Sequence, residues 1–208
     1  MLGACITGKG SLFPASANYF LPSAKIVGIM SNLDENDLKY PLGRYTAPAT
    51  ISPEQRGLWI EEMAKLPANL SKAVAGLSNN QLDTPYRPGG WTVRQVVHHL
   101  PDSHMQSYTR FRLALTENSP VIKPYEEGAW AELSDAKTAA VAPSLALIDG
   151  LHTRFVLLLN SMTNADFAKT FRHPELGERR LDWTLGLYAW HCLHHVAHIT
   201  NLRSRQGW

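Results

Sequence analysis

Four long stretches of the chain carry apolar residues at steps of three and four, the period of one face of an α-helix. No other part of the chain shows a comparable pattern of alternating apolar and polar residues that would predict strands. Each amphipathic helix must bury its apolar side against another element, so the sequence predicts an all-α fold, a four-helix bundle. The predicted helices cover residues 52–77, 92–117, 143–162 and 183–205.

Local signals mark where these helices begin and where they bend. Ser52 and Thr92 are each followed by a glutamine three residues later, the pattern of a capping box. Asp182 is expected to cap the last helix. Pro67 and Pro101 lie inside the first two helices, where each removes one backbone hydrogen bond, so a bend is expected at both.

The predicted elements form a single domain over residues 31–208. Residues 1–30 are predicted to be an irregular N-terminal extension without a function of its own. The length of 208 residues fits one domain, and a hydrophobic content of 44% excludes an intrinsically disordered chain. Between the long helices, a short helix is predicted over residues 126–133 and a tight turn or small hairpin over residues 173–180.

Charge, hydropathy and cysteine content exclude several classes of protein. The 20 basic residues barely exceed the 18 acidic ones and are scattered, which argues against nucleic-acid binding. No unbroken apolar run is long enough to predict a membrane span, and prolines interrupt the N-terminal segment where a signal peptide would be continuous. Cys5 and Cys192 cannot form a disulfide framework, which fits a cytoplasmic protein.

Histidines are concentrated in two short windows, HHLPDSH in the second predicted helix and HCLHHVAH in the fourth. The four histidines of the second window lie within an arc of about 100° on one helix face. Two imidazoles four residues apart can bind one ion at about 2.0–2.1 Å, and a third from a facing helix completes a three-ligand site with an open position. Periodicity leaves two pairs open, His191 with His195 and His194 with His198.

A structural role and a pH-sensing role both account for these histidines less well than a metal does. A single histidine on a helix is usually a core or surface residue, but four on one face would each cost about 1–3 kcal/mol if buried without a partner. A pH-sensing cluster would not need histidines on a second helix. A divalent metal site is therefore the favoured interpretation, and both zinc and nickel suit imidazole ligands, with one ion per chain.

Two motifs resemble those of a known family of metal-binding bundles. The segments GGWTVRQVVHHLPDSH and WHCLHHVAHI are similar to the DinB/YfiT-like superfamily, and the resemblance to its YfiT-type branch extends from Tyr40 to Trp208. It implies an up-down-down-up bundle that is often a homodimer. Members of this branch are described as metal-dependent hydrolases or as bacillithiol S-transferases.

The resemblance also implies a set of ligands. The family places one ligand at the histidine before a leucine in the second helix, which corresponds to His99, and two more four residues apart in the last helix, which correspond to His191 and His195. His198 stands where the family often has glutamine, so it is expected beside the ligands together with His194. Pro101 departs from the small residue usual at its position.

The expected ligands support two chemistries. Three neutral imidazoles leave the ion's charge uncompensated, so either a water or a thiol at the open position would lose its proton near neutral pH. Hydrolytic helices of the His-Glu-x-x-His type have a carboxylate next to the first ligand, where this chain has Cys192, interpreted as a small buried residue. Asp102 is the nearest carboxylate and is expected to support a ligand imidazole or to accept a proton.

Three functions follow from this interpretation. The favoured one is transfer of a low-molecular-weight thiol, such as a bacillithiol-like compound, to a small electrophilic substrate, since a metal-bound thiol needs no strong protein base. The alternatives are metal-dependent hydrolysis of a small substrate and a non-enzymatic stress-response or binding module in which the ion only joins two helices. The candidates for substrate binding are Arg94, Arg110, Arg112, Tyr108 and Trp130.

Overall fold

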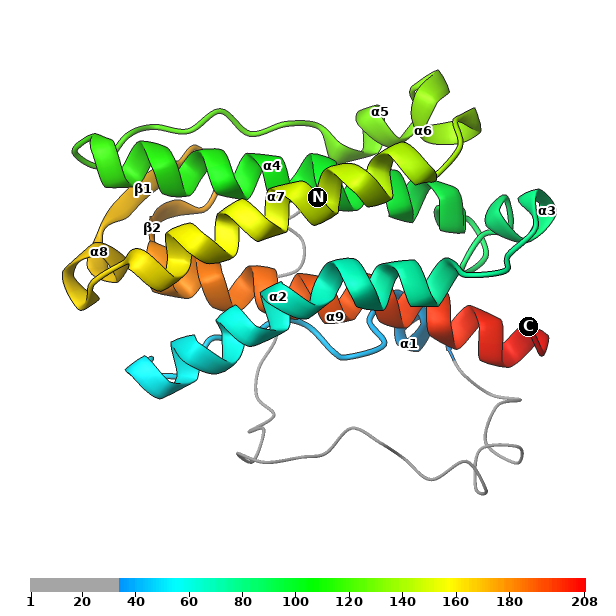
Figure 1. Cartoon of the computed structure of the whole chain (residues 1–208), viewed down its shortest axis with the longest axis horizontal. Helices are drawn as coiled ribbons and strands as arrows, with labels where there is room; N and C mark the ends of the chain where they lie inside the picture. The colour runs from blue at the N-terminus through cyan, green and yellow to red at the C-terminus, as the bar shows by residue number, and fades with distance from the viewer. Residues whose placement is uncertain (1–33) are drawn as a thin grey trace.

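The computed structural model describes residues 34–208, in which four long helices form one bundle (Figure 1). The directions of the long helices follow the predicted order, because α2 and α9 run one way along the bundle while α4 and α7 both run the other way (Figure 1). The all-α, up-down-down-up fold is thereby confirmed, and the predicted extension over residues 1–30 lies outside the described residues. The long helices are α2 (Pro53–Val74), α4 (Val93–Thr116), α7 (Ala142–Ser161) and α9 (Leu181–Gln206).

Each long helix packs against two of the others. Helix α2 contacts α9 and α7, and α4 contacts the same two helices, so α2 and α4 occupy opposite corners of the bundle. The core between them is closed by large apolar side chains with almost no exposed surface, whose burial drives the association of the four helices. These include Met63, Leu66, Leu70, Leu100, Phe111, Ile148, Phe155, Leu185, Tyr188 and Ile199.

Shorter elements fill the connections. The predicted hairpin is present as an antiparallel pair, with Thr170 opposite Arg180, and Val121 adds a parallel bridge to Arg172. The sequence predicts a single short helix over residues 126–133, whereas the structure has two in this connection, α5 and α6, both packed on α4. The short elements are α1 (Glu35–Lys39), α3 (Asn79–Leu82), α5 (Glu127–Ala131), α6 (Ser134–Thr138), α8 (Asn164–Ala168), β1 (Thr170–His173) and β2 (Gly177–Arg180).

The predicted helix starts are present with one correction. The Ser52 hydroxyl accepts from the backbone of Gln55 at 3.2 Å, and the Thr92 cap forms a complete capping box. Asp182, however, is not the cap of α9, because the helix begins directly after β2 and its cap residue is Arg180. Asp182 lies in the first turn instead, where its carboxylate accepts from Arg180 at 2.6 Å and from the Trp183 backbone at 2.7 Å.

Helix α7 has the length and mean hydropathy of a membrane-crossing helix, the one candidate within residues 34–208. Its apolar residues are interrupted by Asp149, His152 and Arg154. One side of the helix packs into the bundle through buried side chains such as Ile148 and Phe155. The apolar composition of α7 is therefore explained by the side of the helix that packs into the bundle core.

Gly186 allows the segment after α1 and the helix α2 to approach α9 closely. A Cβ at this position would lie 2.7 Å from a ring atom of Trp59 and would also overlap the Tyr45 hydroxyl. Gly150, in the middle of α7, has no atom within 4 Å of its Cβ position. The two glycines thus differ in packing although both lie inside long helices.

We expect Gly186→Ala to lower the free energy of unfolding by about 1–3 kcal/mol, because Tyr45 and Trp59 must move to admit the methyl group. The matched control, Gly150→Ala, should raise it by about 0.5–1 kcal/mol through helix propensity alone. Urea denaturation followed by circular dichroism measures both. Equal effects of the two substitutions would contradict this account of Gly186.

Candidate metal centre

All nine histidines of the chain are buried, with no more than 8% of any of them exposed. Loss of hydration on burial disfavours the charged imidazolium, so it lowers the pKa of every one of them, to about 3 for His99 and to about 4 for His152 and His198. The rings are therefore neutral at pH 7. A neutral imidazole has one N–H donor and one nitrogen lone pair, the form that binds metal ions.

Three of these rings converge at the interface of α4 and α9. The Nε2 atom of His191 lies 3.3 Å from Nε2 of His99 and 3.1 Å from Nε2 of His195. Each of the three residues offers one ligand atom within 4.8 Å of the others. The structure thus brings to His99 the pair His191 and His195, and not the other pair with the same spacing.

The converging nitrogen atoms fit a tetrahedral cation. Two ligand atoms that are each about 2.0–2.1 Å from a tetrahedral zinc ion lie about 3.3–3.4 Å apart, close to the distances between these Nε2 atoms. Because hydrogen bonds join atoms in pairs, three converging ring nitrogens cannot all satisfy one another. A divalent cation would accept all three lone pairs at once, so the residues present fit such an ion.

Local sequence and helix packing explain how the rings meet. The capping box at Thr92 fixes the start of α4, so that His99 lies two turns into the helix and faces α9. On α9, His191 and His195 are one turn apart on the same side. The indole of Trp91 packs over His99, with ring centroids 4.8 Å apart, and covers this end of the cluster.

The two remaining histidines of the α9 window lie beside the cluster and do not join it. His198 donates from Nε2 to the carbonyl of Lys39 at 3.1 Å and stacks on Tyr86, with ring centroids 3.9 Å apart. His194 stacks on Trp190 at 4.3 Å. Within residues 34–208 the group that could hold a metal ion therefore consists of three imidazoles, one fewer than the four protein ligands of a structural zinc site.

Asp102, expected to support a ligand imidazole or to accept a proton, is half-buried in α4. Burial raises the pKa of its carboxyl group to about 6, and the nearby Asp135 contributes to the same shift. No hydrogen bond joins it to an imidazole in the part of the chain that the structure describes. The neighbour of His191 is instead His104, whose Nε2 lies 3.2 Å from Nδ1 of His191.

The sequence does not reveal two further functional candidates. His104 belongs to the HHLPDSH window but is five residues from His99, so helix periodicity gives no reason to place it near the ligands. His152 is an isolated histidine in α7, and its Nε2 lies 2.9 Å from Nδ1 of His104. No pattern in the sequence marks His152, because its partners come from other helices.

The arginines expected to bind substrate have different environments. Arg94 is buried and bound by the protein itself, through Asp83 at 2.6 Å and the carbonyl of Ala139 at 2.8 Å. Arg112 is exposed and donates to the hydroxyl of Tyr108 at 3.2 Å. Arg110 is buried, and residues 34–208 provide no ion pair for its guanidinium.

The remaining candidates are placed as follows. Tyr108 packs edge-on against Phe155, with ring centroids 5.2 Å apart, and Trp130 is exposed, with its ring 4.8 Å from that of Tyr125. The Cys192 sulfur points into the core, 3.6 Å from the Met63 sulfur, and burial raises the pKa of the thiol well above its usual range. Cys192 is therefore the small buried residue that the sequence predicts.

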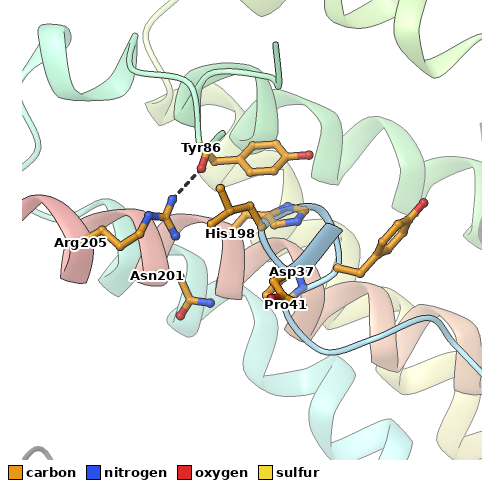
Figure 2. A pocket seen from close by; sticks show the side chains of 8 residues that line it. Asp37, Pro41, Tyr86, His198, Asn201 and Arg205 are labelled. Atoms are coloured by element: carbon orange, nitrogen blue, oxygen red, sulfur yellow. Dashed lines mark hydrogen bonds between the residues drawn. The ribbon is translucent and has the colours of Figure 1, made fainter. Parts of the chain in front are cut away.

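A cavity of about 370 Å³ lies next to the cluster, between α1, α9 and the loop that holds Tyr86 (Figure 2). His198 forms part of its wall, and its ring centroid is 5.3 Å from that of His195. Arg205 reaches across one end to donate to the carbonyl of Tyr86 at 2.6 Å. The lining residues are Asp37, Leu38, Tyr40, Pro41, Tyr86, His198, Asn201 and Arg205.

The buried histidines predict an acid-sensitive fold. Their folded-state pKa values lie below the value of about 6.5 for the unfolded chain, so the unfolded state binds more protons as the pH falls through 6.5. The free energy of unfolding of metal-free protein should then decrease by about 1.4 kcal/mol per pH unit for each such proton. Urea denaturation between about pH 7.5 and pH 5 measures this slope. A stability that is constant over this range would contradict the neutral, buried state of the rings.

Comparison with known proteins supports the same family as the fold does. Residues 62–199 match the model of the DinB superfamily. The chain is 57% identical over 173 residues to a Bacillus cereus protein named "Putative metal-dependent hydrolase", covering 83% of this chain and 99% of that protein. A Bacillus mycoides protein of the same kind is 56% identical over 172 residues, with the same coverage.

A solved structure agrees with the fold as well. YfiT from Bacillus subtilis, described as "a probable metal-dependent hydrolase with an unusual four-helix bundle topology", superposes with a TM-score of 0.81 at 53% identity, over 83% of this chain and 99% of YfiT. Sequence, topology and the three converging imidazoles agree, and this chain belongs to the DinB superfamily.

Proposed function

We propose that this protein is a metal-dependent enzyme that binds one divalent cation, Zn²⁺ or Ni²⁺, through His99, His191 and His195. The observation that carries the proposal is the convergence of three neutral, buried ring nitrogens with no fourth protein ligand among residues 34–208. A purely structural zinc site would have four protein ligands. This difference argues against a module in which the ion only joins two helices.

We propose further that the enzyme transfers a low-molecular-weight thiol to a small electrophile. A bound cation would hold the thiol as its thiolate, the nucleophilic form. The sulfur then forms a bond to an electrophilic carbon, the bond from that carbon to its leaving group breaks, and the leaving group departs with the electron pair. The thiol proton goes to solvent, so the reaction needs no protein carboxylate at the site, consistent with the lack of a hydrogen bond between Asp102 and the imidazoles among residues 34–208.

The cavity beside His198 is suited to the polar part of such a thiol compound, the part that carries its ammonium and carboxylate groups. It presents a carboxylate from Asp37, an amide from Asn201 and a guanidinium from Arg205, which together can bind a molecule that carries both an ammonium and a carboxylate group. The His198 wall lies directly beside His195. A thiol anchored in the cavity would therefore have its reactive end near the three imidazoles.

Hydrolysis of a small substrate is the second candidate, and the names of the relatives favour it. Hydrolysis needs a group that accepts a proton from the attacking water. Asp102, half-buried with its pKa raised to about 6, is the carboxyl group whose titration range suits that role.

His195→Ala should abolish metal binding and activity together, because it removes one of three ligands. Metal content by elemental analysis, with consumption of an alkyl halide in the presence of L-cysteine, measures both. His98→Gln is the matched control, since His98 is also a buried histidine of the bundle but contacts Ser144 at 2.7 Å and not the cluster. Full metal content in the His195 variant would refute the ligand set. Thiol-independent ester or amide cleavage by loaded wild type, without thiol transfer, would favour the hydrolase.

Arg205→Ala should raise the KM for L-cysteine about 10- to 100-fold with a smaller change in kcat, as expected for loss of a charge-assisted hydrogen bond to the substrate. Metal content should stay at the wild-type level, because Arg205 lies in the cavity wall and is not one of the three ligands. Arg112→Ala, a change at an exposed arginine of α4, is the control. An unchanged KM would show that the cavity does not bind the thiol.

A further inference from the structure

A chain of hydrogen bonds leads from a backbone carbonyl through three imidazoles to the candidate metal centre. It begins at the carbonyl of Met63 in α2, 2.6 Å from Nδ1 of His152 in α7. It continues from Nε2 of His152 to Nδ1 of His104 in α4 at 2.9 Å. It ends with Nε2 of His104, which lies 3.2 Å from Nδ1 of His191 in α9. Each of the four long helices thus contributes one member.

The carbonyl at the start determines the direction of every bond in this chain. A carbonyl oxygen only accepts, so Nδ1 of His152 carries the proton that it shares with Met63. A neutral imidazole has a single N–H, so Nε2 of His152 is an acceptor and Nδ1 of His104 must donate to it. The same reasoning makes Nε2 of His104 the acceptor and Nδ1 of His191 the donor. Nε2 of His191, which faces His99 and His195, is left with a free lone pair.

We propose that His104 and His152 are positioning residues that fix His191 in the tautomer with its proton on Nδ1, so that Nε2 is ready to bind the cation. This inference rests on the proposed metal site and adds two residues that act through a ligand without touching the ion. Metal-binding histidines are commonly fixed by a hydrogen bond from the second ring nitrogen, and removal of the partner typically weakens metal binding 10- to 100-fold.

The packing around this chain of hydrogen bonds holds its imidazole rings in place. His104 has no exposed surface and His152 has 1%, so water does not compete for their nitrogens. The ring of Tyr188 packs edge-on against His104, with centroids 5.0 Å apart, and its hydroxyl donates to the Ser103 carbonyl at 3.2 Å. By contrast, Nδ1 of His195 has no hydrogen-bond partner among residues 34–208. Of the two ligands on α9, His191 is therefore the one whose orientation the protein sets.

The tautomers can be read directly in the wild-type protein. Long-range ¹H–¹⁵N NMR correlations on metal-free protein at neutral pH distinguish a protonated ring nitrogen from an unprotonated one. We expect His152, His104 and His191 all to carry the proton on Nδ1. A proton on Nε2 of His191 in the metal-free protein would overturn the inference, and this measurement does not depend on whether any variant folds.

Two substitutions at one position test the effect on metal affinity. His104→Leu removes the acceptor for His191 and should weaken Zn²⁺ binding about 10- to 100-fold in a competition titration with a chelating dye. His104→Gln should restore most of the affinity, because its amide oxygen can accept from His191 while its NH₂ group donates to His152. His98→Gln is again the control for a change at a buried histidine. Wild-type affinity in His104→Leu would overturn the inference.

The outcome of this test is separate from that of the proposed function. If His195→Ala also keeps its Zn²⁺, the metal site itself is wrong. If His195→Ala loses Zn²⁺ while His104→Leu binds it as tightly as wild type, only the role of the hydrogen-bonded chain is wrong. Circular dichroism and thermal denaturation of the His104 variants establish that the comparison is made between folded proteins.

Discussion

The structure depends on finding hydrogen-bond partners for the nitrogen atoms of neutral imidazoles that are buried inside the helix bundle. Burial of a polar ring is unfavourable unless its nitrogen atoms find partners, because water no longer supplies them. The fold supplies carbonyl groups to His152 and His198, a serine hydroxyl to His98 and other imidazoles to His104 and His191. The Nε2 atoms of His99, His191 and His195 at the α4–α9 interface face only one another, and hydrogen bonds in pairs cannot satisfy all three. Their convergence is explained by a cation, and that explanation underlies the functional proposals.

The helix arrangement makes this convergence possible. Since α4 and α7 run in the same direction, the connection between them crosses the length of the bundle and brings α4 beside α9 (Figure 1). Helix α7 then occupies the corner from which His152 reaches His104. A bundle with simple alternating directions would bring different faces together. The β1–β2 hairpin and the short helices α5 and α6 pack against the long helices α4 and α9. They contribute no residue to the imidazole cluster.

Sequence patterns predict the structure well where the physical cause is local. The Thr92 capping box and the apolar period of α2 and α7 predict their helices because the interactions involved lie within four residues along the chain. The prediction of Asp182 as a cap is wrong because β2 continues directly into α9, a fact about hairpin pairing that no pattern near Asp182 records. Asp102 has the right spacing from His99, but among residues 34–208 no hydrogen bond joins its carboxyl group to an imidazole.

Sequence patterns alone predict the number of long helices, the face of α9 that carries histidines and, through resemblance to a family, the expected ligands. Only the tertiary structure brought His191 rather than His194 to His99, and only it joined Met63, His152 and His104 in one chain. The physical reason is distance along the sequence. The rings in these contacts are 48 to 92 residues apart, so their meeting depends on how each helix is rotated and where the helices cross, which follows from packing of the whole core.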